Sequence, residues 1–358
     1  MLWLLICYVN LSQTSIREIG KSISFELYFV SFVFLNPGTP TQYSFYGILN
    51  LYIGELLLVD INCGERLFDC PRYCQDPNFF VTYCPLGCDA NLNPITRKLY
   101  CNNFASDKYK SNESLTFEII KSLGKWSYQL NEYRKLEGIW VKDVFKDQYS
   151  KNIGTLRFVD LLYSDARLAG GYNALLGLAP NENGFVHQLF EQNLIDRVAV
   201  TFVPTFPRGR FIAGERANRS YCREDQWTTH STIHPHFWFL RAEEIQIGDQ
   251  IYFNQTITFG FDAKLRIPAN HLDPLLRKRI LFQRAYNDQL EASINSERLN
   301  FKLRIGRRAI RCPTHFWSTS AARYTNTAGG WSFGISDRVC LFFDYETMNV
   351  GLGTLIRR

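Results

Sequence analysis

Short apolar runs, separated by polar and turn-forming residues, set the pattern of this chain. Each run is four to seven residues long, at 56–59, 198–203, 237–240 and 299–305. Runs of that length are typical of buried strands. A stretch further along has the period of a helix instead, with one apolar face made of Phe185, Val186, Leu189, Phe190 and Leu194. The pattern predicts an all-β protein with a few short helices.

Composition and length agree with this fold class. The chain has 358 residues, among them 28 Phe and 19 Tyr, and aromatic side chains suit a pleated, half-buried surface. The length is sufficient for a large core in one or two units. We therefore expect two lobes.

Apolar segments near the start are short. We interpret residues 1–20, which open on an apolar run, as a candidate signal peptide, although no basic residue precedes that run. A second apolar run, at 27–35, is far below the roughly 20 residues of a transmembrane helix. We expect no transmembrane segment.

Cysteines and glycosylation sequons indicate the compartment. The chain has ten cysteines, and the pattern Asn-x-Ser/Thr begins at Asn10, Asn112, Asn218 and Asn254. Both features are typical of proteins that fold in an oxidising compartment. We predict a secreted or lumenal glycoprotein.

Six cysteines lie close together, at Cys63, Cys70, Cys74, Cys84, Cys88 and Cys101. An even, local set predicts a disulfide framework, although its connectivity cannot be deduced from the sequence. The alternative is zinc, because two Cys-x3-Cys spacings are present. Disulfides are favoured, since thiolate zinc sites are more expected in reducing compartments.

Charge and histidines point to no further chemistry. The chain has 40 Lys and Arg against 34 Asp and Glu, and the excess lies mainly between residues 264 and 312. There we expect a solvated helix and strand, with a surface that attracts anions as the alternative. No nucleic-acid motif accompanies the charge. His230, His234 and His236 lack the context of a zinc motif, so we predict no nucleic-acid partner, no metal and no cofactor.

Segments in both halves of the chain resemble one enzyme family. The first is the apolar run that ends at Asp60, and the second is 256–261, with Pro268 nine residues after Phe259. Further segments follow in the family's order, at 172–179, 209–214 and 331–334. In these residues the chain resembles the pepsin-like aspartic peptidases, over about residues 45–355.

The resemblance implies a bilobal acid-protease fold with a cleft between the lobes. The lobes would span 38–202 and 211–358, joined by a linker at 203–210. It also implies a disulfide between Cys222 and Cys340. Only 27 residues separate Cys312 from Cys340, so the second lobe is shorter than the family pattern and Cys312 is a candidate free thiol.

The resemblance further implies a loss of catalysis. Aspartic peptidases use two carboxyl groups that share one proton, of which the ionised one activates water. Asp60 is the surviving first acid, and Phe259 stands at the second position. Asn62 replaces a glycine that the tight turn requires. Asp262, three residues after Phe259, is an alternative second acid in a shifted register.

The family's flap, a hairpin that carries a tyrosine over the substrate, corresponds to residues 126–138. Leu130 or Asn131 stands in place of that tyrosine, depending on the register. Tyr133 would lie at the tip of the hairpin.

These features predict a monomeric peptidase homologue that binds a peptide or protein without cleaving it. One alternative is an active aspartic endopeptidase that uses Asp60 with an unconventional partner. Another is a degenerate or mispredicted relic without binding function. The turn Gly38-Thr39-Pro40 favours the relic, because it lies 22 residues before Asp60, about twice the family's usual separation.

Overall fold

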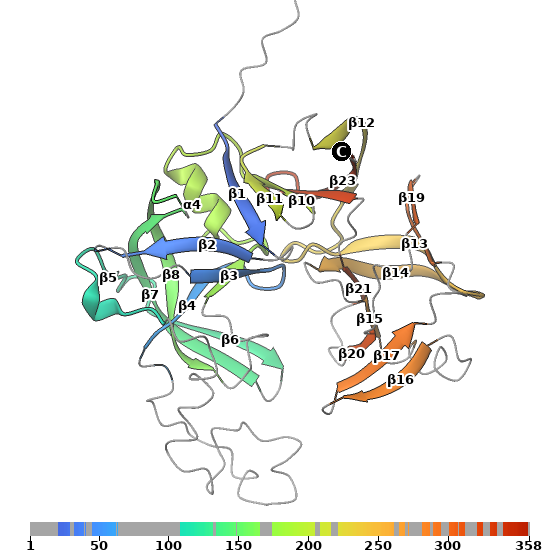
Figure 1. The fold of residues 1–358 in the computed structure, drawn as a ribbon, viewed down its shortest axis with the longest axis horizontal. Helices are drawn as coiled ribbons and strands as arrows, with labels where there is room; N and C mark the ends of the chain where they lie inside the picture. The colour runs from blue at the N-terminus through green and yellow to red at the C-terminus, as the bar shows by residue number, and fades with distance from the viewer. Residues whose placement is uncertain are drawn as a thin grey trace, which may run out of the picture.

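A computed structural model describes most of the strands of this chain. The described residues are 21–28, 32–38, 40, 45–61, 63, 108–131, 134–147, 149–164, 174–204, 208–215, 221–260, 265–268, 271, 281–286, 289–294, 301–306, 308–311, 321–324, 330–334 and 339–356. They form two curled β-sheets with little helix (Figure 1). The expected all-β, bilobal fold is confirmed.

The first sheet contains strands from the beginning, the middle and the end of the chain. Its strands are β1 (Ile23–Tyr28), β2 (Phe32–Pro37), β3 (Phe45–Asn50), β4 (Leu56–Val59), β5 (Glu118–Ile119), β6 (Lys125–Asn131), β7 (Arg134–Lys146), β8 (Asn152–Ser164), β9 (Ala174–Gly177), β10 (Ala199–Val203), β11 (Arg208–Ala213), β12 (Cys222–Ser231), β22 (Val339–Asp344) and β23 (Asn349–Leu355). The short helix η3 (Ser111–Glu113) precedes β5. The apolar runs at 56–59 and 198–203 are therefore strands, as predicted.

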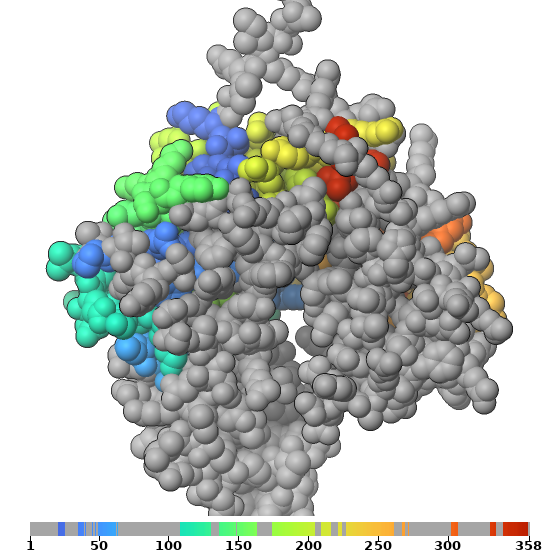
Figure 2. Space-filling model, in the orientation of Figure 1, coloured from blue at the N-terminus to red at the C-terminus, as the bar shows by residue number. Residues whose placement is uncertain are grey.

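One part of this sheet is an antiparallel platform, in the order β12-β23-β22-β10-β11-β1. Residues from the start of the chain (blue), its middle (yellow-green) and its end (red) adjoin one another on one face (Figure 2). Residues 203–210, expected as a linker between lobes, connect β10 and β11, and Val203 pairs with Arg210. The strands on either side of this segment are therefore neighbours in the platform, and the second sheet begins later, at β13.

The second sheet is built from the remaining strands: β13 (Leu240–Ile247), β14 (Gln250–Gly260), β15 (Leu265–Pro268), β16 (Leu281–Tyr286), β17 (Gln289–Ile294), β18 (Phe301–Ile305), β19 (Arg308–Arg311), β20 (Ala321–Tyr324) and β21 (Trp331–Gly334). The apolar run at 299–305 supplies β18. The run at 237–240 differs from expectation, because β13 starts only at Leu240.

Two buried aromatic residues, one before β13 and one between β22 and β23, meet at the end of β9. The indole nitrogen of Trp238 donates a hydrogen bond to the carbonyl of Leu178, at 2.6 Å. The hydroxyl of Tyr345 donates to the same carbonyl, at 2.9 Å, and the two rings meet edge to face at 4.9 Å. One backbone oxygen at the end of β9 thus accepts from two large buried side chains.

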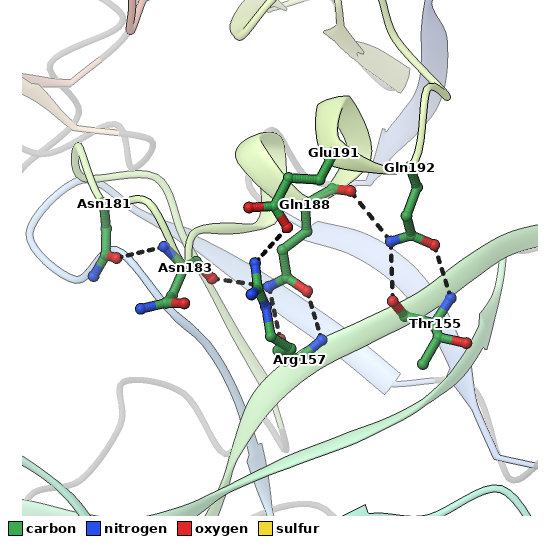
Figure 3. Close-up of polar contacts among 7 residues, drawn as sticks. All are labelled: Thr155, Arg157, Asn181, Asn183, Gln188, Glu191 and Gln192. Carbon is green, nitrogen blue, oxygen red and sulfur yellow. Dashed lines mark hydrogen bonds and ion pairs between the residues drawn. The ribbon is translucent and has the colours of Figure 1, made fainter. Parts of the chain in front are cut away.

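Helix α4 (Phe185–Glu191) covers an edge of β8. The side-chain amide of Gln188 accepts from the N–H of Arg157 at 2.5 Å and donates to its carbonyl at 2.8 Å. Gln192 makes the same pair of bonds with Thr155, at 3.0 and 2.9 Å (Figure 3). Two glutamines four residues apart on the helix therefore take the place of a neighbouring strand, and they satisfy backbone groups at an edge.

The apolar face of α4 differs from the sequence prediction at Phe190, which is 41% exposed. Phe190 lies five residues after Phe185, which is roughly 140° around a helix and off the buried face. The polar residue Gln188 is buried instead, together with Val186 and Leu189.

Candidate functional site

Asp60 directly follows β4, and backbone hydrogen bonds hold it on both sides. Its N–H donates to the carbonyl of Leu161 on β8 at 3.1 Å, and it forms an isolated parallel bridge with Tyr109. The N–H of Tyr109 donates to the carbonyl of Val59 at 2.9 Å. The side chain of Asp60 is buried, so its position is fixed by the sheet.

A second carboxyl group lies beside Asp60, on the neighbouring strand. β4 runs parallel to β8, with Leu58 opposite Asp160. Because side chains alternate along a strand, Asp60 points to the same face as Leu58 and hence as Asp160. The two carboxyl groups form a hydrogen bond, and both residues are at most 2% exposed. Such a bond needs a proton on one of the groups, so the pair shares it.

Its surroundings favour the protonated form of Asp160. Burial raises the pKa of Asp160 well above its ordinary value, and the charge of Asp60 and the hydrogen bond with it act in the same direction. Oδ1 of Asp160 accepts no hydrogen bond within the described part of the chain. A neutral carboxyl group is the form that such surroundings stabilise.

A third buried acid, Asp143 on β7, lies on the same face of the sheet. It accepts hydrogen bonds from the hydroxyls of Tyr109, at 2.7 Å, and of Thr116, and from the N–H of Val144, at 2.8 Å. Burial and the bond to Asp143 raise the pKa of the Tyr109 hydroxyl. The ring of Tyr109 meets Phe158 edge to face, at 5.2 Å. The acids thus sit inside the hydrophobic core.

This arrangement can hold protons, but it is not open to a substrate. Asp60, Asp143 and Asp160 are all nearly inaccessible to solvent. No group of three or more His, Cys, Asp or Glu side chains among the described residues has the geometry of a metal site.

The two sheets contain the same four-strand motif. In the first sheet β3 runs parallel to β9, β9 antiparallel to β4, and β4 parallel to β8. In the second sheet β14 runs parallel to β21, β21 antiparallel to β15, and β15 parallel to β20. The sequence shows no repeat, but the strand pairing makes β3 the counterpart of β14 and β4 the counterpart of β15.

This repeat corrects the expectation that Asp60 and Phe259 occupy corresponding positions. At the end of β3, Asn50 pairs with Gly177, and at the end of β14, Gly260 pairs with Gly334. Asn50, at the end of β3, therefore corresponds to the end of β14, where Gly260 follows Phe259. Asp60 follows β4 instead, so its counterpart follows β15.

Asn50 closes a turn with its side chain. Its Oδ1 accepts the N–H of Tyr52 at 2.7 Å and that of Ile53 at 2.9 Å. The turn then crosses Gly177, where an added Cβ would lie only 2.5 Å from the carbonyl oxygen of Ile53. Only glycine allows this approach, so Asn50 is fixed at the point where β3, β9 and the turn meet.

Phe259 is a core residue of the second sheet. It is 5% exposed and pairs with Phe333 on β21. The ring of Phe333 is stacked on that of Trp331, with ring centroids 6.3 Å apart. Asp262, the alternative acid, and Asn62 lie outside the described residues.

The residues expected to form the flap lie on β6 and β7, which pair antiparallel. Leu130 and Asn131 end β6, and Tyr133, expected at the tip, lies outside the described residues. A different tyrosine, which sequence reasoning missed, is positioned here. The hydroxyl of Tyr128 donates to the carbonyl of Tyr52 at 3.3 Å, and its ring stacks on Trp126. The hairpin is thereby connected to the Asn50 turn.

The predicted disulfide between Cys222 and Cys340 is present. Cys63 is also disulfide-bonded, with a partner outside the described residues, where the other cysteines expected in that framework also lie. Of the sequons, Asn112 is exposed in η3 and Asn254 is exposed on β14, whereas Asn10 and Asn218 are outside the described ranges.

Comparisons with known proteins add no identity: the chain matches no family model and no curated protein. In the part of the chain that the structure describes, no helix combines the length and the apolar character needed to span a membrane.

Proposed function

We propose that this chain is a pepsin-like aspartic peptidase homologue that binds a peptide or protein without cleaving it, in a secreted or lumenal setting. The observation that carries this proposal is the strand repeat. A catalytic pair formed across two corresponding motifs needs an acid at the same position in each. The positions are Asn50 and Phe259–Gly260, and neither has a carboxyl group.

The spacing of the first motif supports this assignment. Asn50 lies 12 residues after Gly38, close to half of the 22 residues that separate Gly38 from Asp60. The long separation that favoured a relic therefore disappears when Asn50, and not Asp60, takes the first position. The amide of Asn50 makes the turn that a carboxylate would make, but it carries no negative charge to activate water.

The second candidate is an active endopeptidase in which Asp160 is the unconventional partner of Asp60. Their hydrogen bond favours this candidate, because a proton shared by two carboxyl groups is the arrangement that aspartic catalysis uses. Their burial opposes it. A substrate carbonyl would have to reach groups that are at most 2% exposed.

Cleavage and binding assays on the same preparation separate these functions. Reduced, denatured serum albumin is incubated with the protein from acid to neutral pH, and new termini are sought by mass spectrometry. We expect none. Cleavage that a pepstatin-type inhibitor blocks, and that Asp60→Asn and Asp160→Asn both abolish, would establish the second candidate.

Binding is tested with a displayed library of random peptides. We expect selected peptides to bind the protein, and Tyr128→Ala to weaken that binding because its hairpin contacts the Asn50 turn. Tyr149→Ala, a substitution at a tyrosine that is 70% exposed, is the matched control. A folded protein that selects no peptide and cleaves nothing would leave only the relic.

A further inference from the structure

The ribbon of β13 and β14 exposes an unusual set of residues beside a sequon. β18 pairs with β13 on one side of this ribbon, whereas among the described residues the first part of β14, up to Thr256, pairs with β13 alone (Figure 1). Phe253 is 59% exposed and Ile251 is 48% exposed. Large apolar side chains exposed together on one strand indicate a surface that something else covers.

The strand is kinked at the next residue, Asn254. Its φ is +53°, a left-handed conformation that asparagine tolerates better than most residues do. The pairing skips this position, because Glu244 faces Phe253 and Ala242 faces Gln255. The guanidinium of Arg241 donates to the backbone carbonyl of Asn254 at 2.9 Å and so stabilises the kink.

The kink makes the side chain of Asn254 available. Residue 254 is exposed, and its side-chain amide makes no hydrogen bond with another described residue. Asn254-Gln255-Thr256 is a complete acceptor sequon. In a regular strand, the backbone of a sequon would be hydrogen-bonded to neighbouring strands. Here the pairing of β14 with β13 is interrupted at Asn254, the residue that would accept the glycan.

We propose that Asn254 carries an N-linked glycan and that this glycan covers Phe253 and Ile251. The Cys222–Cys340 disulfide, closed in the same chain, is consistent with the oxidising compartment in which this modification takes place. In the transfer, Nδ2 of Asn254 attacks C1 of a lipid-diphosphate-linked oligosaccharide. The N–C1 bond forms, the C1–O bond breaks, the lipid diphosphate leaves with the bonding electrons, and one proton of Nδ2 is released to solvent.

The test uses the full chain, expressed behind a cleavable secretion leader in eukaryotic cells, with medium and cell pellet analysed together. Enzymatic deglycosylation in ¹⁸O-labelled water converts a glycosylated Asn254 to labelled aspartate, which mass spectrometry detects. We expect the label in the wild type and in Thr256→Ser, which keeps the sequon. We expect no label in Asn254→Gln or Thr256→Ala. An unlabelled wild-type peptide would overturn the proposal, whether the protein is secreted or retained.

A separate measurement tests whether the glycan covers Phe253 and Ile251. Binding of a hydrophobic dye should rise after native deglycosylation of the wild type, and Asn254→Gln should match the deglycosylated protein. Asn112→Gln is the control, because that sequon is in η3, on the first sheet's side of the chain. Equal dye binding before and after deglycosylation would show that the glycan, if present, does not cover Phe253 and Ile251.

Discussion

Asp160 hydrogen-bonds Asp60 from the adjacent parallel strand, so the acid expected to have lost its partner has one within its own sheet. The pair lies on the core face beside Tyr109, and not at the position that corresponds to Phe259. We therefore expect the Asp60–Asp160 pair to affect folding stability. Whether the protein is catalytic depends on the residues at the corresponding positions, Asn50 and Phe259.

The carboxyl pair predicts a protein that is more stable at mildly acidic than at neutral pH. An acid whose pKa is raised by folding binds its proton more tightly in the folded state. Its contribution to stability is complete below the unfolded pKa, about 3.9, and is lost as the pH rises through the raised folded pKa. Urea denaturation across this range should show the free energy of unfolding falling with pH.

Asp160→Asn should flatten that dependence. An amide keeps a donor for Asp60 and does not titrate, so we expect a gain of about 1 kcal/mol or more at neutral pH and little change in acid. The surface substitution Asp249→Asn is the control, and should leave the slope unchanged. An unchanged slope in Asp160→Asn would mean that other groups cause the pH dependence.

Phe259→Asp should not create a peptidase, because Asn50 supplies no second acid. It places a carboxylate in the core of the second sheet, and an uncompensated buried charge costs roughly 3–5 kcal/mol. Phe259→Leu, which changes shape but not polarity, should cost less than the roughly 3–5 kcal/mol of a Phe→Ala truncation. Thermal unfolding ranks the two variants, and a fully stable Phe259→Asp would contradict the buried position.

Gln188→Ala should destabilise the first sheet. It leaves the N–H and carbonyl of Arg157 without the bonds drawn in Figure 3. A fully buried group that loses its hydrogen bond costs about 1–3 kcal/mol, and these part-buried groups should cost less than that each. Gln192→Ala is the matched comparison, since its bonds to Thr155 are exposed. We expect a smaller loss there, and equal losses would argue against a role for burial.

Replacing Cys222 and Cys340 by alanine should lower stability by about 2–5 kcal/mol. The bond closes a loop with a sequence separation of 118 and ties β12 to β22 in the platform. Chemical denaturation of the double variant measures the loss. Reduced wild-type protein should lose at least as much stability, because reduction also opens the bond of Cys63, and a wild type insensitive to reduction would contradict a structural role for the Cys222–Cys340 bond.

The sequence was sufficient for the fold class, because strand-length apolar runs such as 56–59 depend only on local pattern. It also identified Cys222 and Cys340 through the resemblance. It did not identify Asn50. The nearby Asp60 follows a better apolar run, and the register that equates β3 with β14 depends on pairings between residues far apart in the chain, Gly47 with Ala174 and Ile257 with Trp331. Such pairings leave no local signal.

Asp160 was missed for a related reason. An isolated Asp within the apolar stretch of β8 reads as an ordinary strand residue, and its proximity to Asp60 follows only from the parallel register of β4 and β8. The spacing from Gly38, which lies 12 residues before Asn50, was a signal that could have identified Asn50, but the missing carboxyl group removed the usual marker.

The strand pairing in the platform also constrains the order in which the chain can fold during synthesis. β10 pairs with β11 on one side and with β22 on the other. During synthesis on a ribosome, the first side can pair at once, while the second must wait until almost the whole chain has emerged. An unpaired edge invites contacts with other chains. A message truncated before β22 would therefore be expected to yield an aggregating product, even though every other described strand of the first sheet except β23 had already been translated.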